Sequence, residues 1–140
     1  MTPVLLDTGV IVALLDRSEQ RHEECKAAVL GLKSPLVTCE AAIAESCYLL
    51  RGATGAAEAV VENVEKGIFQ IPFSLPRSAA AVRRVLRRYR NRQIDFADAC
   101  LICLAEELRS GEILTLDSDF EIYRWDRKRP FRLLIPVMRT

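Results

Sequence analysis

Residues 4–16, which read VLLDTGVIVALLD, contain the transition that decides the fold of this chain. The first three residues form a short apolar run, which Asp7, Thr8 and Gly9 interrupt. The apolar segment that follows, from Val10 to Leu15, is too long for a loop. This pattern is typical of a strand that ends before a capping residue and is followed by a helix. We therefore predict a first β-α step over these residues.

The same alternation continues along the chain, because short apolar runs are followed by segments with apolar residues at helical spacing. Strands are expected at 4–6, 36–39, 68–73, 113–116 and 132–135, and helices at 10–15, 19–32, 40–51, 56–66, 76–89 and 95–108. Several of these strands are apolar on both faces, which is typical of a parallel sheet covered by helices on both sides. The predicted fold class is α/β, a three-layer α/β/α sandwich with a parallel five-stranded sheet.

The composition indicates one globular domain. The chain has 140 residues, of which 50% are apolar and 28% charged, and this is the usual size of a domain with a single substantial core. No apolar run approaches the roughly 20 residues of a membrane-spanning helix, and no basic segment leads into a signal-like apolar stretch. We expect a single domain over residues 1–140, no membrane partner and a cytoplasmic location.

Cysteine and histidine chemistry is disfavoured. The five cysteines are odd in number and lie in apolar surroundings, which is unlike a disulfide framework. Cys100 and Cys103 form a C-x-x-C without a second pair or a nearby histidine, so zinc binding or redox activity is a minor alternative. His22 is the only histidine and lies among charged residues, which disfavours catalysis of the Ser-His or Cys-His type.

Acidic side chains collect at one edge of the predicted sheet. Asp7 and Asp117 follow strands, whereas Glu45 and Asp98 lie in the first turns of helices whose N-termini face the same edge. Asp119 adds a fifth carboxylate. In open α/β sheets the ligand crevice lies at this edge, where the strand order reverses. A sheet order of 3-2-1-4-5 would place that reversal between the strands that precede Asp7 and Asp117.

Two explanations of these acids are open. Most of them could cap helices or short turns, with Asp95 as the N-cap of its own helix. Glu45 is too far into its helix to be a cap, and its apolar neighbours predict partial burial, which requires a cation or hydrogen-bond partners. Carboxylates without Cys or His suit Mg²⁺ or Mn²⁺, ions that lower the pKa of water and neutralise charge on a phosphodiester.

Four pieces of the sequence carry a resemblance to a known family. They are VLLDTGVIVALLD at 4–16, AIAESCYLL at 42–50, IDFADACLICLAEEL at 94–108 and ILTLDSDFEIYR at 113–124. In this order they resemble the PIN-domain ribonucleases, most closely the VapC-like toxins of bacterial type II toxin-antitoxin modules. The resemblance implies a PIN-like sheet order of 3-2-1-4-5 and a metal-dependent endonuclease that cleaves single-stranded or looped RNA, with 5′-phosphate and 3′-hydroxyl products.

The resemblance also implies the site and the partners. By position, Asp7, Glu45, Asp98 and Asp117 would be catalytic and would bind Mg²⁺ or Mn²⁺, with Asp119 as a further or alternative ligand and Thr8 as a hydroxyl near the ion. Besides the RNA substrate, it implies a homodimer and a cognate small antitoxin protein whose segment blocks the site.

Seven arginines and no acid lie between Arg77 and Arg92. A solvated face of an amphipathic helix is the simple explanation, but such a face usually carries mixed charges at i,i+4 spacing. We predict that this face binds RNA phosphates or the acidic tail of an antitoxin. The residues expected to do so are Arg83, Arg84, Arg87, Arg88, Arg90 and Arg92.

Two other classes of protein are alternatives to a nuclease. A phosphoacceptor receiver domain shares the length and the sheet class, but it would normally show adjacent acids after the first strand and a lysine after the last. Leu6-Asp7-Thr8 and Ile135-Pro136-Val137 stand at those places. A catalytically silent α/β binding module, whose acids only cap helices, is the stronger alternative, because a fold class does not by itself determine function.

Overall fold

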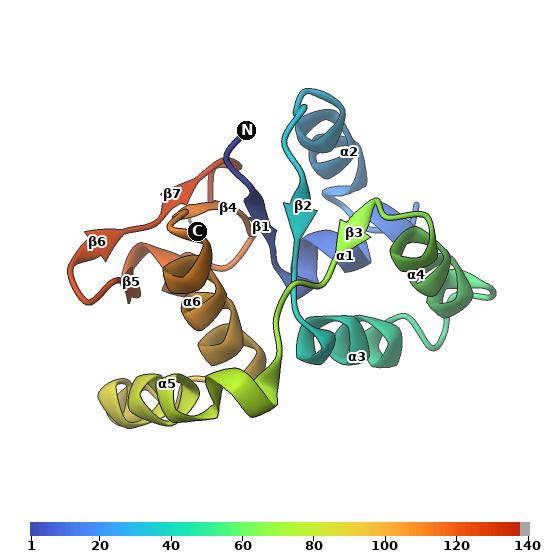
Figure 1. Cartoon of the computed structure of the whole chain (residues 1–140). Helices are drawn as coiled ribbons and strands as arrows, with labels where there is room; N and C mark the ends of the chain where they lie inside the picture. Colours follow the sequence, from blue (N-terminus) through green and yellow to red (C-terminus); the bar gives the residue numbers. More distant parts are fainter. Residues whose placement is uncertain (138–140) are drawn as a thin grey trace.

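A five-stranded parallel sheet forms the centre of the computed structural model, which describes residues 1–137 (Figure 1). The order along the sheet is β3-β2-β1-β4-β7, and all four neighbouring pairs are parallel. Its strands are β1 (Val4–Leu6), β2 (Leu36–Val37), β3 (Phe69–Gln70), β4 (Glu112–Leu114) and β7 (Arg132–Leu133). Counted within this sheet, the order is the predicted 3-2-1-4-5, and it reverses between β1 and β4.

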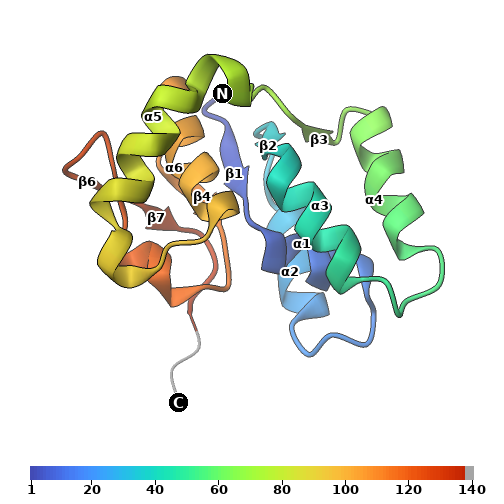
Figure 2. The same ribbon diagram turned by 90° about the horizontal axis from the view of Figure 1, so that it is seen from below.

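Helices cover both faces of the sheet, so the predicted three-layer arrangement is confirmed. Figures 1 and 2 both place α5 and α6 on one side of the sheet and α1 to α4 on the other. The helices are α1 (Thr8–Leu15), α2 (His22–Leu30), α3 (Glu40–Leu49), α4 (Ala56–Glu65), α5 (Leu75–Arg88) and α6 (Phe96–Leu108), with short 3-10 helices η1 (Arg90–Arg92) and η2 (Ser118–Glu121). Within residues 1–137, none of the helices has the length and apolar character needed to span a bilayer.

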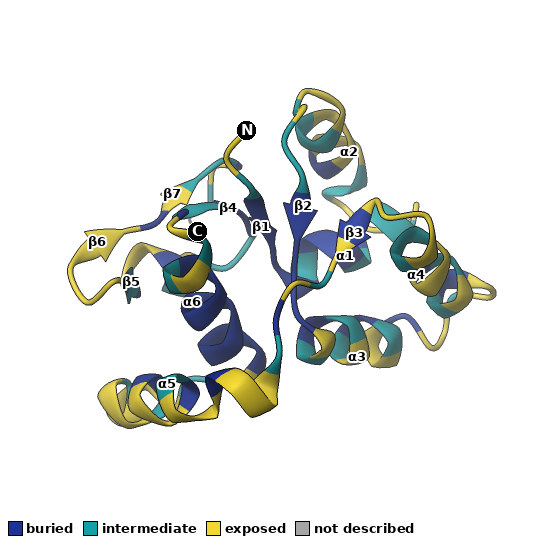
Figure 3. Cartoon of the chain, in the orientation of Figure 1, coloured by how far each residue is buried: buried dark blue, intermediate teal, exposed yellow. Residues whose placement is uncertain are grey.

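Alternating strand residues build two cores, one on each face of the sheet. Leu5 and Ile113 contact the core beneath α5 and α6, whereas Leu6 and Leu114 contact the core on the side of α1 and α4. Successive side chains of a strand point to opposite faces, and burying one such aliphatic side chain contributes about 1.5–3 kcal/mol. Helix α6 is buried along most of its length, because it packs between the sheet and α5 (Figure 3).

A hairpin outside the main sheet was not predicted. Its antiparallel strands are β5 (Arg124–Trp125) and β6 (Arg129–Pro130). Trp125 packs against Gly111 so closely that a Cβ at Gly111 would lie 2.0 Å from the indole Nε1 atom. The hairpin therefore closes one end of the core beneath α6, at a place where only glycine fits.

The structure also shortens the predicted strand at 113–116. Strand β4 ends at Leu114, so that Thr115 and Leu116 separate it from Asp117. The carboxyl end of β4 therefore continues as a short loop at the same edge of the sheet where β1 leads into α1.

Candidate active site

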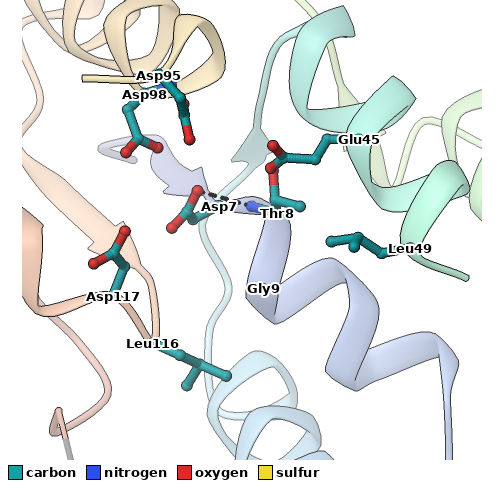
Figure 4. A pocket seen from close by; sticks show the side chains of 9 residues that line it. All are labelled: Asp7, Thr8, Gly9, Glu45, Leu49, Asp95, Asp98, Leu116 and Asp117. Atoms are coloured by element: carbon teal, nitrogen blue, oxygen red, sulfur yellow. Dashed lines mark hydrogen bonds between the residues drawn. The ribbon is translucent and has the colours of Figure 1, made fainter. Parts of the chain in front are cut away.

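A pocket of about 270 Å³ opens at the carboxyl edge of the sheet, between the ends of β1 and β4 (Figure 4). Helix α3 forms one wall and the start of α6 another. This is the edge where the reversed strand order predicts a ligand crevice. The lining residues are Asp7, Thr8, Gly9, Glu45, Leu49, Asp95, Asp98, Leu116 and Asp117.

Three aspartates converge in this pocket. One carboxylate oxygen from each of Asp7, Asp98 and Asp117 lies within 4.8 Å of the other two. Figure 4 shows the three carboxylates turned toward one another from three different elements. Asp7 and Asp117 meet because β1 and β4 are hydrogen-bonded neighbours, and Asp98 arrives from the first turn of α6. Asp7 and Asp98 are only 5% and 6% exposed, and Asp117 is half-buried.

Hydrogen bonds fix two of these carboxylates. The Thr8 backbone N–H donates to Asp7 Oδ1 at 2.8 Å, and the Thr115 hydroxyl donates to Asp7 Oδ2 at 2.6 Å. The Asp119 backbone N–H donates to Asp117 Oδ1 at 2.9 Å. Within residues 1–137, no donor reaches the Asp98 carboxylate, whose own backbone N–H donates to Asp95 Oδ1 at 2.8 Å.

Capping explains part of this arrangement. Asp7 caps α1, Asp117 caps η2, and Asp95 caps α6 as predicted. Asp98 and Glu45 accept no such bond, because both lie inside their helices. Capping therefore accounts for the positions of some acids, but it does not explain why the Asp98 carboxylate lies buried beside Asp7.

The three aspartates are held where their charged forms are disfavoured. Burial raises the pKa of Asp7 to about 6, although the hydrogen bonds from Thr115 and Thr8 oppose this rise. Burial, and then repulsion by Asp7 and other nearby carboxylates, raises the pKa of Asp98 to about 9. Burial also raises the pKa of Asp117. A cation between these groups would stabilise their ionised forms.

These pKa values predict how stability depends on pH. The pKa of Asp98 rises from its ordinary value of 3.8 to about 9 on folding, so the folded state binds more protons than the unfolded state between these pH values. Stability is therefore lost as the pH rises toward 9. We expect the melting temperature in EDTA to fall by more than about 4 °C between pH 5.5 and pH 9.

Differential scanning calorimetry with and without Mn²⁺ checks this prediction. Mn²⁺ should restore more stability at pH 9 than at pH 5.5, because it competes with protons for the same oxygens. Asp98→Asn is the control, since it removes the titrating group and should flatten the dependence on pH. An equal or higher melting temperature in EDTA at pH 9 than at pH 5.5 would contradict the expectation that ionisation of the buried carboxylates destabilises the protein.

The donor atoms in the pocket suit a hard divalent ion. Within residues 1–137, Thr8 Oγ1 is the only buried side-chain nitrogen or oxygen that lacks a hydrogen-bond partner, and Thr8 lines the pocket. Together with the aspartates, it forms a set of oxygen donors without any cysteine or histidine. Mg²⁺ and Mn²⁺ prefer carboxylate and other oxygen ligands. The residues present therefore fit the predicted ion.

Comparison with known proteins identifies the family of this chain. The family model of the PIN domain matches residues 4–126. The chain belongs to the PIN-domain family. Ribonuclease VapC26 of Mycobacterium tuberculosis is 27% identical to this PIN domain over 116 residues, which are 81% of the chain and 86% of that protein. The predicted resemblance to VapC-like PIN-domain proteins is thus confirmed.

A solved structure has the same fold. The crystal structure of Mycobacterium tuberculosis VapC20, described as a toxin that cleaves the sarcin-ricin loop, superposes with a TM-score of 0.77. The match covers 91% of this PIN domain and 99% of that chain, at 19% sequence identity. This likeness confirms the PIN-like fold.

The structure places the other two predicted acids differently from the three aspartates. Glu45 lines the same pocket from α3 and is half-buried, but it lies outside the group of three. Asp119 does not line the pocket, and its Oδ1 lies 3.7 Å from Arg92 Nη2. Asp119 reaches the site through its backbone, whose N–H holds Asp117. These positions suggest different roles for Asp117 and Asp119, which the sequence did not separate.

The predicted arginines form an exposed surface along α5 and η1. Val82 and Val85 are buried on the opposite side of α5, so that the arginines face away from the core. Within residues 1–137, Arg92 is the one member with an ion pair, to Asp119 beside the pocket. We call this set the arginine surface: Arg83, Arg84, Arg87, Arg88, Arg90 and Arg92.

Thr115 is a residue of the site that the sequence did not reveal. Its hydroxyl contacts Asp7, and it is completely buried two residues before Asp117. Threonine is common in strands because it is β-branched, so the apolar run around it gave no reason to separate it from its neighbours.

Proposed function

We propose that this PIN domain is a metal-dependent endoribonuclease that hydrolyses RNA phosphodiester bonds with Mg²⁺ or Mn²⁺. The observation that carries the proposal is the convergence of three buried or half-buried carboxylates in one open pocket, together with a Thr8 hydroxyl that has no hydrogen-bond partner within residues 1–137. The relatives support RNA as the substrate, since VapC26 is named a ribonuclease and VapC20 a toxin that cleaves the sarcin-ricin loop.

The residues of the pocket would have separate roles. Asp7, Asp98 and Asp117 would hold the ion, with Glu45 on the α3 wall as a further ligand or as an acceptor of a hydrogen bond from water. When bound, a divalent ion lowers the pKa of water and neutralises charge on the phosphodiester. Thr8 and Thr115 keep both oxygens of Asp7 in place through their hydrogen bonds.

The proposal is tested by RNA cleavage with purified protein that is free of any partner. Single-stranded and stem-loop RNAs should be cut with Mg²⁺ or Mn²⁺ and left intact in EDTA, and Asp7→Asn should remove the activity. We expect 5′-phosphate and 3′-hydroxyl ends. End-group analysis that instead finds 2′,3′-cyclic phosphates would exclude this hydrolytic route.

A silent binding module is the second candidate, because Asp7, Asp95 and Asp117 all cap helices. In such a module these acids would serve structure alone. Absence of any cleavage dependent on Mg²⁺ or Mn²⁺ by the folded wild-type protein would favour it.

We further propose that the protein is the toxin of a toxin-antitoxin module. The support is the likeness to two VapC proteins, of which VapC20 is described as a toxin. The proposal includes a cognate small antitoxin as partner, a homodimer, a cytoplasmic location and a single PIN domain over residues 1–140.

The arginine surface would hold the RNA backbone. We expect the double variant Arg84→Glu, Arg88→Glu to weaken RNA binding and to flatten its dependence on salt, because each lost phosphate contact lowers the salt slope for single strands by about 0.7. Affinity measured at several salt concentrations checks this. The matched control is Lys26→Glu, Lys33→Glu, which changes the net charge equally at exposed positions in and after α2, on the other side of the sheet.

Unchanged RNA affinity and salt slope in the arginine double variant would remove this surface from the RNA site. Its remaining role would then be the predicted alternative, binding of an acidic segment of the antitoxin.

A further inference from the structure

Thr115 connects two of the clustered acids through one hydroxyl group. Its Oγ1 donates to Asp7 Oδ2 at 2.6 Å and accepts from the Asp117 backbone N–H at 3.0 Å. The residue is 0% exposed and lies just after β4, beside the end of β1. The hydroxyl thus connects the ends of β1 and β4, the two strands between which the strand order reverses.

The direction of each hydrogen bond follows from the chemistry of the groups. A threonine hydroxyl has a single proton and two lone pairs, whereas an ionised carboxylate only accepts. The proton must therefore point to Asp7, and a lone pair of Oγ1 meets the Asp117 N–H. With Thr8 N–H on Oδ1, each oxygen of Asp7 has one fixed donor, so the carboxylate cannot rotate without breaking a bond.

We infer that Thr115 is a positioning residue that holds Asp7 and Asp117 in the arrangement that binds a divalent cation. The inference rests on the proposed function only in placing a cation between these acids. Groups that orient metal ligands are worth about 10- to 100-fold in metal affinity or activity. Thr115 orients Asp7 by a hydrogen bond to its carboxylate, and it orients Asp117 by a hydrogen bond from the Asp117 backbone N–H.

Thr38 provides a matched control within the same chain. It is also 0% exposed and also follows a strand of the main sheet, β2. Its Oγ1 donates to the Leu6 carbonyl oxygen at 2.8 Å and contacts none of the clustered acids. Replacing either threonine with valine removes one buried hydroxyl at the same edge of the sheet, but only Thr115→Val releases a carboxylate.

The test compares the Mn²⁺ affinities of metal-free proteins by isothermal titration calorimetry, without RNA. We expect Thr115→Val to weaken Mn²⁺ binding at least about 10-fold and Thr115→Ser to stay within about 3-fold of the wild type. Thr38→Val should also stay within about 3-fold, although both valine variants lower the melting temperature. If Thr115→Val does not fold, Thr115→Ala against Thr115→Ser isolates the hydroxyl, because both lack the methyl group.

Wild-type affinity in Thr115→Val, or an equal loss in Thr38→Val, would overturn the inference even if the wild type cleaves RNA. The expected ranking of affinities without any RNA cleavage would support Thr115 and refute the nuclease. A wild type that binds no Mn²⁺ would refute both.

Discussion

Asp98→Asn should reduce RNA cleavage by at least about 100-fold while stabilising the metal-free protein at alkaline pH. Asp98 is almost completely buried, no donor within residues 1–137 reaches its carboxylate, and its pKa is raised to about 9 by burial and by the neighbouring acids. Asparagine keeps the shape and removes the charge that repels Asp7. Cleavage rates with Mn²⁺ and melting temperatures in EDTA at pH 9 measure the two effects.

These two effects separate a metal ligand from a structural acid. Glu58→Gln is a suitable control, because Glu58 also lies in the first turn of a helix, α4, but is exposed and does not line the pocket. Glu58→Gln should change neither the cleavage rate with Mn²⁺ nor the melting temperature in EDTA. If Asp98→Asn instead destabilises the metal-free protein and retains cleavage, then Asp98 serves the helix dipole of α6 and not an ion.

Glu45→Gln should leave a folded protein that binds Mn²⁺ more weakly and cleaves RNA about 10- to 100-fold more slowly. Glu45 lies inside α3, where it cannot cap the helix, and it lines the acid pocket without a hydrogen-bond partner within residues 1–137. The glutamine amide can still form hydrogen bonds and has the same shape. A purely structural role therefore predicts little loss.

Glu40→Gln provides the comparison for this prediction. Glu40 is in the first turn of the same helix and exposed, but it does not line the acid pocket. Calorimetric titration with Mn²⁺ and cleavage assays on both variants give the result. Equal activity of the two variants would show that Glu45 is not part of the metal site.

Much of the fold could be predicted because local pattern and tertiary structure agree. The apolar strands, the helical spacing and the caps indicate alternating elements, and these permit few arrangements other than a covered parallel sheet. The hairpin at Arg124–Trp125 and Arg129–Pro130 gave no such indication. Its turn has positive φ at Asp126 and Arg127, 50° and 69°, a backbone conformation in which glycine and asparagine are the usual residues.

The residues that form the site could be predicted better than their arrangement in space. A parallel sheet brings the residues after its strands to one edge, so Asp7 and Asp117 could be placed together in advance. Sequence spacing does not determine where side chains end, and so it did not distinguish Asp119, which faces Arg92, from Asp117 in the pocket. Nor could it show that Thr115, which lies just after β4, contacts Asp7 at the end of β1.

The most direct measurement follows RNA cleavage while metal-free protein is titrated with Mn²⁺, with the bound ion counted by electron paramagnetic resonance in the same sample. We predict no cleavage in EDTA, a rate that rises in proportion to the fraction of protein with Mn²⁺ bound, and loss of both in Asp98→Asn. Full cleavage in EDTA, or saturation with Mn²⁺ without cleavage of single-stranded or stem-loop RNA, would contradict the proposed metal-dependent ribonuclease.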